Sequence, residues 1–154
     1  MGRNDEGSRP EGVMLMNIRW PGRVLVSLVA VGALAALAPV AGAGGPTCFG
    51  RPATHVGDAG RDVIDGTSGP DVIVTRGGAD DIDGRGGADR ICGGPGPDEI
   101  NGDAGNDRLA GGGGNDELDG DAGDDVLLGG NGIDDLDGGL GNDRCRGGEH
   151  VERC

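Results

Sequence analysis

Aromatic residues are almost missing from this chain of 154 residues, which has one Phe, one Trp and no Tyr. A core built on large aromatic side chains is therefore excluded. Lysine is missing as well, so all 13 basic residues are arginine, and 27 acidic residues outnumber them. The net charge of −14 repels nucleic-acid phosphates and anionic lipid headgroups and attracts cations, so we expect no nucleic-acid partner.

Glycine is the most abundant residue, with 37 copies. Glycine and aspartate at this density lower the propensity for both helix and ordinary strand. On composition alone, a disordered chain would be the default expectation. Whether the chain folds therefore depends on how these residues are ordered along the sequence.

Residues 19–43 have the pattern of an export signal. Arg19 and Arg23 supply the positive region, residues 24–38 are apolar, and residues 41–43 form a small-x-small cleavage site. We expect cleavage after Ala43, a secreted product and no stable membrane insertion after cleavage. An uncleaved membrane anchor is the alternative, but the apolar run is marginal in length for spanning a bilayer.

A nine-residue period organises most of the remaining chain. Ten units follow one another without insertion from Gly57 to Arg146, for example "GDAGNDRLA". Position 4 is Gly and position 6 is Asp in all ten units, and position 1 is Gly in nine, with Thr75 as the exception. Position 8 is Ile or Leu in nine units and Cys145 in the last. A disordered segment has no physical reason to keep this register.

The unit resembles the glycine-rich nonapeptide G-G-x-G-x-D-x-U-x of RTX proteins, also called hemolysin-type calcium-binding repeats. The resemblance covers residues 57–146. It implies an all-β fold, a right-handed parallel β-roll with two short-stranded parallel sheets and two units per coil. It also implies that positions 1–6 form a turn, that positions 7–9 form a strand, and that calcium lies between successive turns.

The residue types suit such a coil. Glycine at positions 1 and 4 permits positive φ and close backbone approach in a tight turn. Position 8 places one apolar side chain in each short strand, and positions 7 and 9 point to the opposite face because strands alternate. Each strand therefore buries one side chain, and the two sheets share a thin core.

The aspartates at position 6 are the candidate calcium ligands. With two units per coil, aspartates 18 residues apart stack about 4.8 Å apart, and two calcium–oxygen bonds of about 2.3–2.6 Å span that distance. Four gaps along each edge predict up to eight ions, with turn carbonyls completing each shell. One edge has Asp62, Asp80, Asp98, Asp116 and Asp134, and the other has Asp71, Asp89, Asp107, Asp125 and Asp143.

The charge of the segment after the cleavage site agrees with this number of ions. Residues 44–154 contain 24 acidic residues and nine arginines, for a net charge of −15, against +16 for eight calcium ions. Without metal, stacked carboxylates repel by about 1–4 kcal/mol per pair, and the thin core is too small to offset this. We therefore expect a largely unfolded calcium-free chain that folds on binding calcium.

The segments beside the repeats are predicted to be caps. Residues 44–56 form the N-terminal cap, with Phe49 covering the open end of the core. Residues 147–154 form the C-terminal cap, a degenerate eleventh unit with Glu152 in place of Asp and Cys154 at position 8. Terminal repeats of solenoids need such caps.

The four cysteines are expected to form two disulfide bonds, since their number is even and the chain carries an export signal. Three pairings are possible. We favour Cys145 with Cys154, both at position 8 of successive units, which leaves Cys48 with Cys92. Zinc is the rival interpretation, but the CxxC and HxxxH spacings are missing.

No catalytic function is expected. Residues 44–154 contain one serine, Ser68, and two histidines, His55 and His150, which lie in the two caps, so no triad can be assembled. The leading hypothesis is a secreted calcium-binding structural or interaction module, with an unidentified partner at the cell surface or in a matrix. The alternatives are a flexible acidic calcium buffer without a unique fold and a hydrolase that uses a pair of aspartates.

Overall fold

The computed structural model describes residues 45–154, and the predicted export signal lies outside these residues. The described part of the chain contains short β-strands and no helix, so it offers no helix that could cross a membrane. The strands form a small hairpin and two parallel six-stranded sheets. The predicted all-β roll is confirmed, as a solenoid of about five coils.

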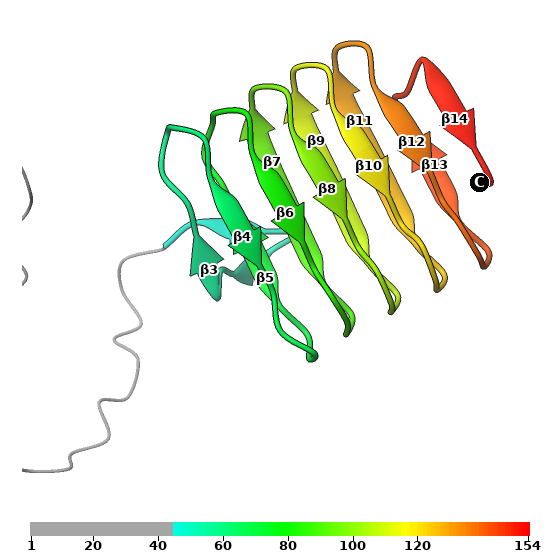
Figure 1. Cartoon of the computed structure of the whole chain (residues 1–154), viewed down its shortest axis with the longest axis horizontal. Helices are drawn as coiled ribbons and strands as arrows, with labels where there is room; N and C mark the ends of the chain where they lie inside the picture. The colour runs from blue at the N-terminus through cyan, green and yellow to red at the C-terminus, as the bar shows by residue number, and fades with distance from the viewer. Residues whose placement is uncertain (1–44) are drawn as a thin grey trace, which may run out of the picture. The chain divides into compact units, whose positions relative to one another are not determined.

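Figure 1 shows the two parallel sheets one behind the other, joined by turns along an upper and a lower edge. The front sheet consists, in spatial order, of β4 (Val63–Asp65), β6 (Asp81–Asp83), β8 (Glu99–Asn101), β10 (Glu117–Asp119), β12 (Asp135–Asp137) and β14 (His150–Glu152). The back sheet consists of β3 (His55–Val56), β5 (Val72–Val74), β7 (Arg90–Pro95), β9 (Arg108–Gly113), β11 (Val126–Asn131) and β13 (Arg144–Arg146). Each coil contributes one strand to each sheet.

The register of both sheets follows the repeat. In the front sheet Ile82 lies opposite Ile100, and in the back sheet Ile91 lies opposite Leu109. Each pair is 18 residues apart, which is two units of nine. The sequence period therefore sets which residues stack on one another.

The core is the ladder of position-8 side chains. Eight of the ten are at most 1% exposed and form one cluster: Ile73, Ile82, Ile91, Ile100, Leu109, Leu118, Leu127 and Leu136. Ile64 and Cys145, at the two ends of the ladder, are partly buried against it. The thin core expected from the repeat is confirmed.

The N-terminal segment covers the end of the roll with β3, and not with Phe49 as we predicted. Strands β1 (Thr47–Cys48) and β2 (Arg51–Pro52) form an antiparallel hairpin that contacts β5 and β7, on the outer face of the back sheet. The guanidinium carbon of Arg108 lies over the ring of Phe49 in this hairpin, 5.5 Å from the centroid of that ring. The expectation that Phe49 covers the open end is therefore wrong. His55 stands at the end of the back-sheet ladder instead, opposite Ile73.

The predicted disulfide pairing is confirmed. Cys48 is bonded to Cys92, with a Cα–Cα distance of 5.9 Å, and Cys145 to Cys154, with 5.7 Å. The first bond ties the hairpin to β7, because Cys92 is an outward residue of that strand.

The geometric reason that we gave for the second bond is wrong. In the last coil Val151 lies opposite Leu136, only 15 residues further on, so Val151 takes position 8. Cys154 follows β14 as an exposed residue. The last coil is three residues shorter than the others, which a strict nine-residue count does not reveal.

Candidate calcium centres

All ten position-6 aspartates lie where a turn enters a strand. Those of one set line the upper edge of the roll and those of the other set line the lower edge, because successive units alternate between the sheets. Eight of them are buried: Asp71, Asp80, Asp89, Asp98, Asp107, Asp116, Asp125 and Asp134. Asp62 and Asp143, in the terminal coils, are half-buried.

Each aspartate after the first coil is tied to the coil before it. The backbone N–H of Asp71 donates to Oδ1 of Asp89, and that of Asp89 donates to Oδ1 of Asp107, both at 2.7 Å. The same bond recurs for all eight later aspartates, at 2.7 to 3.2 Å. The carboxylates are thereby held at the level between two stacked turns.

The other carboxylate oxygen of these residues is buried without a hydrogen-bond partner. It is Oδ2 in every case, in Asp80, Asp89, Asp98, Asp107, Asp116, Asp125, Asp134 and Asp143. A buried, unpaired carboxylate oxygen is costly unless a cation or a donor compensates it. One such oxygen stands at each of the eight gaps between stacked turns.

The first coil is different. Oδ2 of Asp62 accepts a 2.8 Å bond from the N–H of Asp58, and Oδ2 of Asp71 accepts bonds from the N–H and hydroxyl of Thr67. The Oδ2 atoms of both carboxylates are thus satisfied by their own turns, and Oδ1 of Asp71 also accepts a 3.4 Å bond from the hydroxyl of Thr54, in the segment before it. Burial acts to raise the pKa of Asp71, but the bonds from Thr67, together with His55 and the bond from Thr54, outweigh it and lower that pKa.

In the later coils, the net effect of burial is to raise the pKa of the stacked aspartates. Burial raises the pKa of Asp98 to about 6 and that of Asp107 to about 7, with the charges of stacked aspartates adding to it. The pKa values of Asp89, Asp116 and Asp125 are raised for the same reasons. Burial and mutual repulsion thus disfavour the charged form of several carboxylates on both edges of the roll.

Glycine at two positions leaves room around the unpaired oxygens. At position 1, a Cβ built on Gly102 would stand 2.9 Å from Oδ2 of Asp107. At position 4, Gly96 has φ of +128° and stacks so closely on Gly78 that a Cβ would overlap the carbonyl group of Gly78. A side chain at either position would fill the space or separate the coils.

Thr75 is the exception at position 1. It is fully buried, and its hydroxyl donates a 2.5 Å bond to the carbonyl of Gly93 in the next coil. The gap beside Asp80 therefore contains a side chain that the other gaps lack. The sequence marked this position as irregular but did not indicate the bond.

The chemistry of these gaps fits a hard cation. Their side-chain ligands are carboxylates, and oxygen donors are what calcium prefers. In the region from residue 45 onward, no group of three or more His, Cys, Asp or Glu side chains is arranged to hold a metal ion by itself. Backbone carbonyls of the closely stacked turns would have to complete each shell, as the sequence argument also required.

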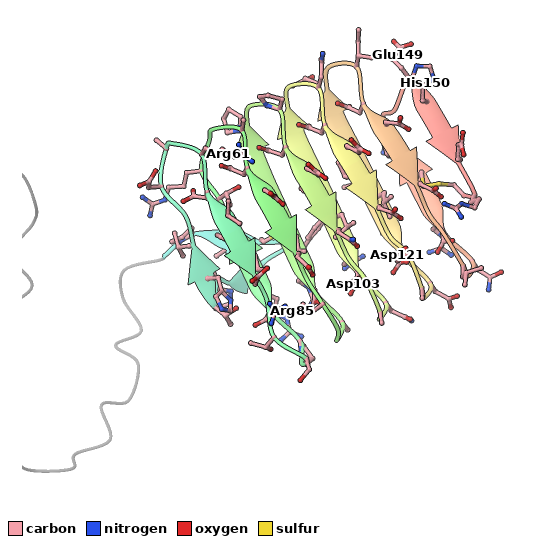
Figure 2. All side chains as sticks on the ribbon, viewed as in Figure 1. Arg61, Arg85, Asp103, Asp121, Glu149 and His150 are labelled. Atoms are coloured by element: carbon pink, nitrogen blue, oxygen red, sulfur yellow. A yellow bond between two sulfur atoms is a disulfide. The ribbon has the colours of Figure 1, made fainter. Side chains whose placement is uncertain are left out.

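An open groove runs along the upper row of buried aspartates. Its floor includes Asp80, Asp98, Asp116 and Asp134, and its walls are the residues on either side of them. Arg61 and His150, which also line it, lie toward opposite ends of this edge (Figure 2).

The RTX calcium-binding nonapeptide repeat matches residues 56–91, 93–127 and 119–149, more than half of the chain. The chain belongs to this family. Its structure is accordingly a calcium-binding RTX β-roll. No curated protein and no solved structure matches the chain.

The sequence analysis missed one class of residue in this RTX roll. At position 9 of alternate units, outward side chains accept hydrogen bonds from backbone N–H groups two residues further on. Oδ1 of Asp83 accepts from the N–H of Arg85, and Oδ1 of Asn101 accepts from that of Asp103. Arg85, Asp103 and Asp121 follow one another along the lower edge (Figure 2), and all three have positive φ. The signal for these turn caps is the recurrence of Asp or Asn at position 9 of alternate units.

Proposed function

We propose that this chain is an exported module whose β-roll assembles when calcium ions are bound between its stacked turns, and that it has a structural or interaction role outside the cell. The observation that carries the proposal is the set of eight buried Oδ2 atoms without a partner, one at each gap. Bound calcium supplies the positive charge and oxygen coordination that these atoms lack.

The residues proposed to hold up to eight ions are the eight later aspartates, together with turn carbonyls. Asp62 and Asp71 were predicted as ligands from their spacing. Their Oδ2 atoms are already hydrogen-bonded within their own turns, so we assign them the smaller contribution. This leaves one main carboxylate for each of the eight gaps.

Coupling of folding to calcium follows from the same groups. Without a cation, the fold buries stacked carboxylates whose pKa values are raised, which favours the unfolded chain at neutral pH. The free energy of calcium binding would then contribute directly to folding. Calcium levels outside cells suit this, because extracellular modules often bind calcium with dissociation constants of about 0.1–1 mM.

The proposal is tested on the chain beginning at Gly44, the expected product of signal cleavage. Circular dichroism in EDTA should show little β-structure, and a calcium titration should produce a cooperative rise to a β-rich spectrum. Graded binding without structure would instead indicate a flexible calcium buffer. A β-rich spectrum that EDTA leaves unchanged would contradict the coupling, and calorimetry gives the number of ions.

Export and a non-catalytic role are parts of the same proposal. The support for export is the signal pattern in residues 19–43, and mass spectrometry of secreted protein should find Gly44 at the N-terminus. The support for a non-catalytic role is the separation of the histidines, with His55 in β3 and His150 in β14 at opposite ends of the roll. Hydrolase activity that is lost in Asp107→Ala without loss of fold would overturn it.

A further inference from the structure

The outward residues of the two sheets differ sharply in charge. Positions 7 and 9 of β4, β6, β8, β10 and β12 form what we call the acidic face, with eight acidic residues and no basic one among ten. Its acidic residues are Asp65, Asp81, Asp83, Glu99, Glu117, Asp119, Asp135 and Asp137. The alternation of strand side chains directs all of them away from the core.

The corresponding positions of β5, β7, β9, β11 and β13 form what we call the arginine face. It has four arginines and no acidic residue among ten, and the other six residues are Val, Leu, Ala or Cys. The arginines are Arg90, Arg108, Arg144 and Arg146. The charges segregate because successive units alternate between the two sheets.

The arginines of this face have no intramolecular carboxylate partner. In the described residues, Arg61, Arg85 and Arg153 pair with three carboxylates of the acidic face, Asp81, Asp65 and Asp137. His55 lies beside Asp71, and no ion pair involves an arginine of the arginine face. On the acidic face, Glu99, Glu117 and Asp135 are exposed and likewise form no ion pair there. Each face therefore carries free charges of one sign.

Part of the arginine face is already covered. The β1–β2 hairpin contacts β5 and β7, is bonded to Cys92, and places Phe49 against Arg108. The outward residues of β11 and β13 lie beyond this hairpin. They combine half-buried Val126 and Leu128 with exposed Arg144 and Arg146.

From this complementarity we propose that the arginine face of one copy of this chain docks on the acidic face of a second copy. Both faces repeat at the same rung spacing of about 4.8 Å, so arginines of one copy can meet carboxylates of the other rung by rung. Because the two faces are different surfaces of one molecule, each added copy leaves one face of each kind free. The assembly therefore grows as an open stack and does not close as a dimer.

This inference rests on the proposed calcium loading, since a chain with net charge −15 repels its own copies and bound calcium neutralises the turns. The contact is also small. The hairpin leaves the rungs of β11 and β13 open. Two rungs at about 4.8 Å and three residues at about 3.3 Å give an open face of roughly 10 by 10 Å, below the roughly 800 Å² per partner of a stable interface. The association is accordingly weak, sensitive to salt and visible at high protein concentration.

The test uses sedimentation velocity on the calcium-loaded chain over a range of concentrations. At about 0.01 M monovalent salt, where charges act over about 30 Å, the average mass should rise continuously with concentration and pass that of a dimer. At about 1 M salt, where they act over about 3 Å, it should return to the monomer. A chain that stays monomeric at low salt, or associates equally at high salt, overturns the proposal.

Charge reversal identifies the faces. Arg144→Glu with Arg146→Glu makes the uncovered part of the arginine face acidic, and Glu117→Arg with Asp135→Arg makes the acidic face partly basic. Each double variant alone should associate about tenfold more weakly than the unaltered chain. An equimolar mixture of the two should recover association, because the unaltered acidic face of the first variant can meet the unaltered arginine face of the second. If both variants fold with calcium but their mixture does not associate, the face-to-face contact is wrong.

Circular dichroism keeps the two proposals separate. A calcium-dependent rise in β-structure in each variant shows that the proposed function holds, whatever the sedimentation result. A matched control is Arg76→Glu, which makes the same change of charge at an exposed turn residue that forms no ion pair and lies outside both faces. It should leave the association of the calcium-loaded chain within about twofold of the original.

Discussion

The backbone N–H of Asp89 donates a 2.7 Å hydrogen bond to Oδ1 of Asp107, one coil further on, while Oδ2 of Asp107 is buried without a partner. One carboxylate thus performs two tasks. Its first oxygen joins two coils through the backbone, and its second oxygen is left for a cation. The same division recurs at every gap, so folding and metal binding depend on the same side chains.

Replacing Asp107 with Asn should separate these tasks. The amide oxygen can still accept the bond from Asp89, but the second oxygen and the negative charge are lost. We expect one calcium ion fewer by calorimetry, and about tenfold more calcium needed for half-maximal folding by circular dichroism. Asp62→Asn is the matched control, because Oδ2 of Asp62 already accepts a bond from Asp58. Equal effects of the two substitutions would contradict the assignment of one main carboxylate per gap.

Acid should partly stabilise the roll in the absence of calcium, because protonation removes the charge of the buried aspartates. The pKa of Asp98 is raised to about 6 and that of Asp107 to about 7, mainly by burial. The folded metal-free chain therefore binds more protons than the unfolded chain between about pH 4 and pH 7, so its stability rises as the pH falls through this window. The β-signal in EDTA should be larger at about pH 5.5 than at about pH 8.

Calcium affinity should change in the opposite sense, because protons compete for the same carboxylates. The calcium concentration for half-maximal binding should be higher at about pH 5.5 than at about pH 8. The Asp107→Asn variant provides the control, since it lacks the group with the highest pKa. A β-structure signal in EDTA that is independent of pH, or that falls in acid, would show that protonation of these aspartates does not stabilise the calcium-free fold.

Much of this architecture could be predicted from sequence, because a strict period transfers directly into register. The 18-residue stacking and the ladder of Ile and Leu at position 8 follow from counting, whereas the cysteine pairing was predicted correctly from a count that fails in the last coil. The count failed at the ends, where the period stops. Phe49 lies on the outer face of the back sheet because the hairpin is tied to Cys92, and Val151 replaces Cys154 in the ladder because the last coil is shorter.

Within the repeats, the missed features depend on neighbours in space. Asp62 has the same place in its unit as Asp98, yet its Oδ2 is satisfied because no coil precedes it. The residues that separate charge between the two faces occupy positions 7 and 9 of the repeat. The separation becomes visible only when odd and even units are compared separately, as the alternation between sheets requires.

Thr75 should weaken the gap beside Asp80. Its buried hydroxyl engages the carbonyl of Gly93, whereas the other units have Gly at position 1. Thr75→Gly frees this carbonyl and the space around the carboxylate, so calcium should bind several-fold more tightly by calorimetry. Stability in EDTA should decrease, because a buried hydrogen bond worth about 1 kcal/mol is lost. The exposed Thr47, which lies in the hairpin away from the aspartate rows, gives the control variant Thr47→Gly. Unchanged or weaker calcium binding in Thr75→Gly would contradict the prediction.

The disulfide bonds should contribute unequally. Cys48–Cys92 closes a separation of 44 residues and Cys145–Cys154 one of nine. Loop-closure entropy predicts losses of about 4 and about 3 kcal/mol when each pair is replaced by serine. Urea unfolding of the calcium-loaded chain measures both. Loss of the first bond should also free the hairpin, which proteolysis within residues 45–53 would detect; continued protection there would show that contacts with β5 and β7 suffice.

Close stacking of the coils can be tested with two adjacent glycines. Gly114 has φ of +151°, and a Cβ there would overlap the carbonyl group of Gly96 in the preceding coil, whereas a Cβ on Gly113 meets nothing within 4 Å. Gly114→Ala should therefore destabilise the calcium-loaded roll by about 1–3 kcal/mol. Gly113→Ala should change stability by less than about 0.5 kcal/mol. Because both variants add one methyl group to the same turn, a similar loss in both would mean that the coils are not packed backbone against backbone at this position.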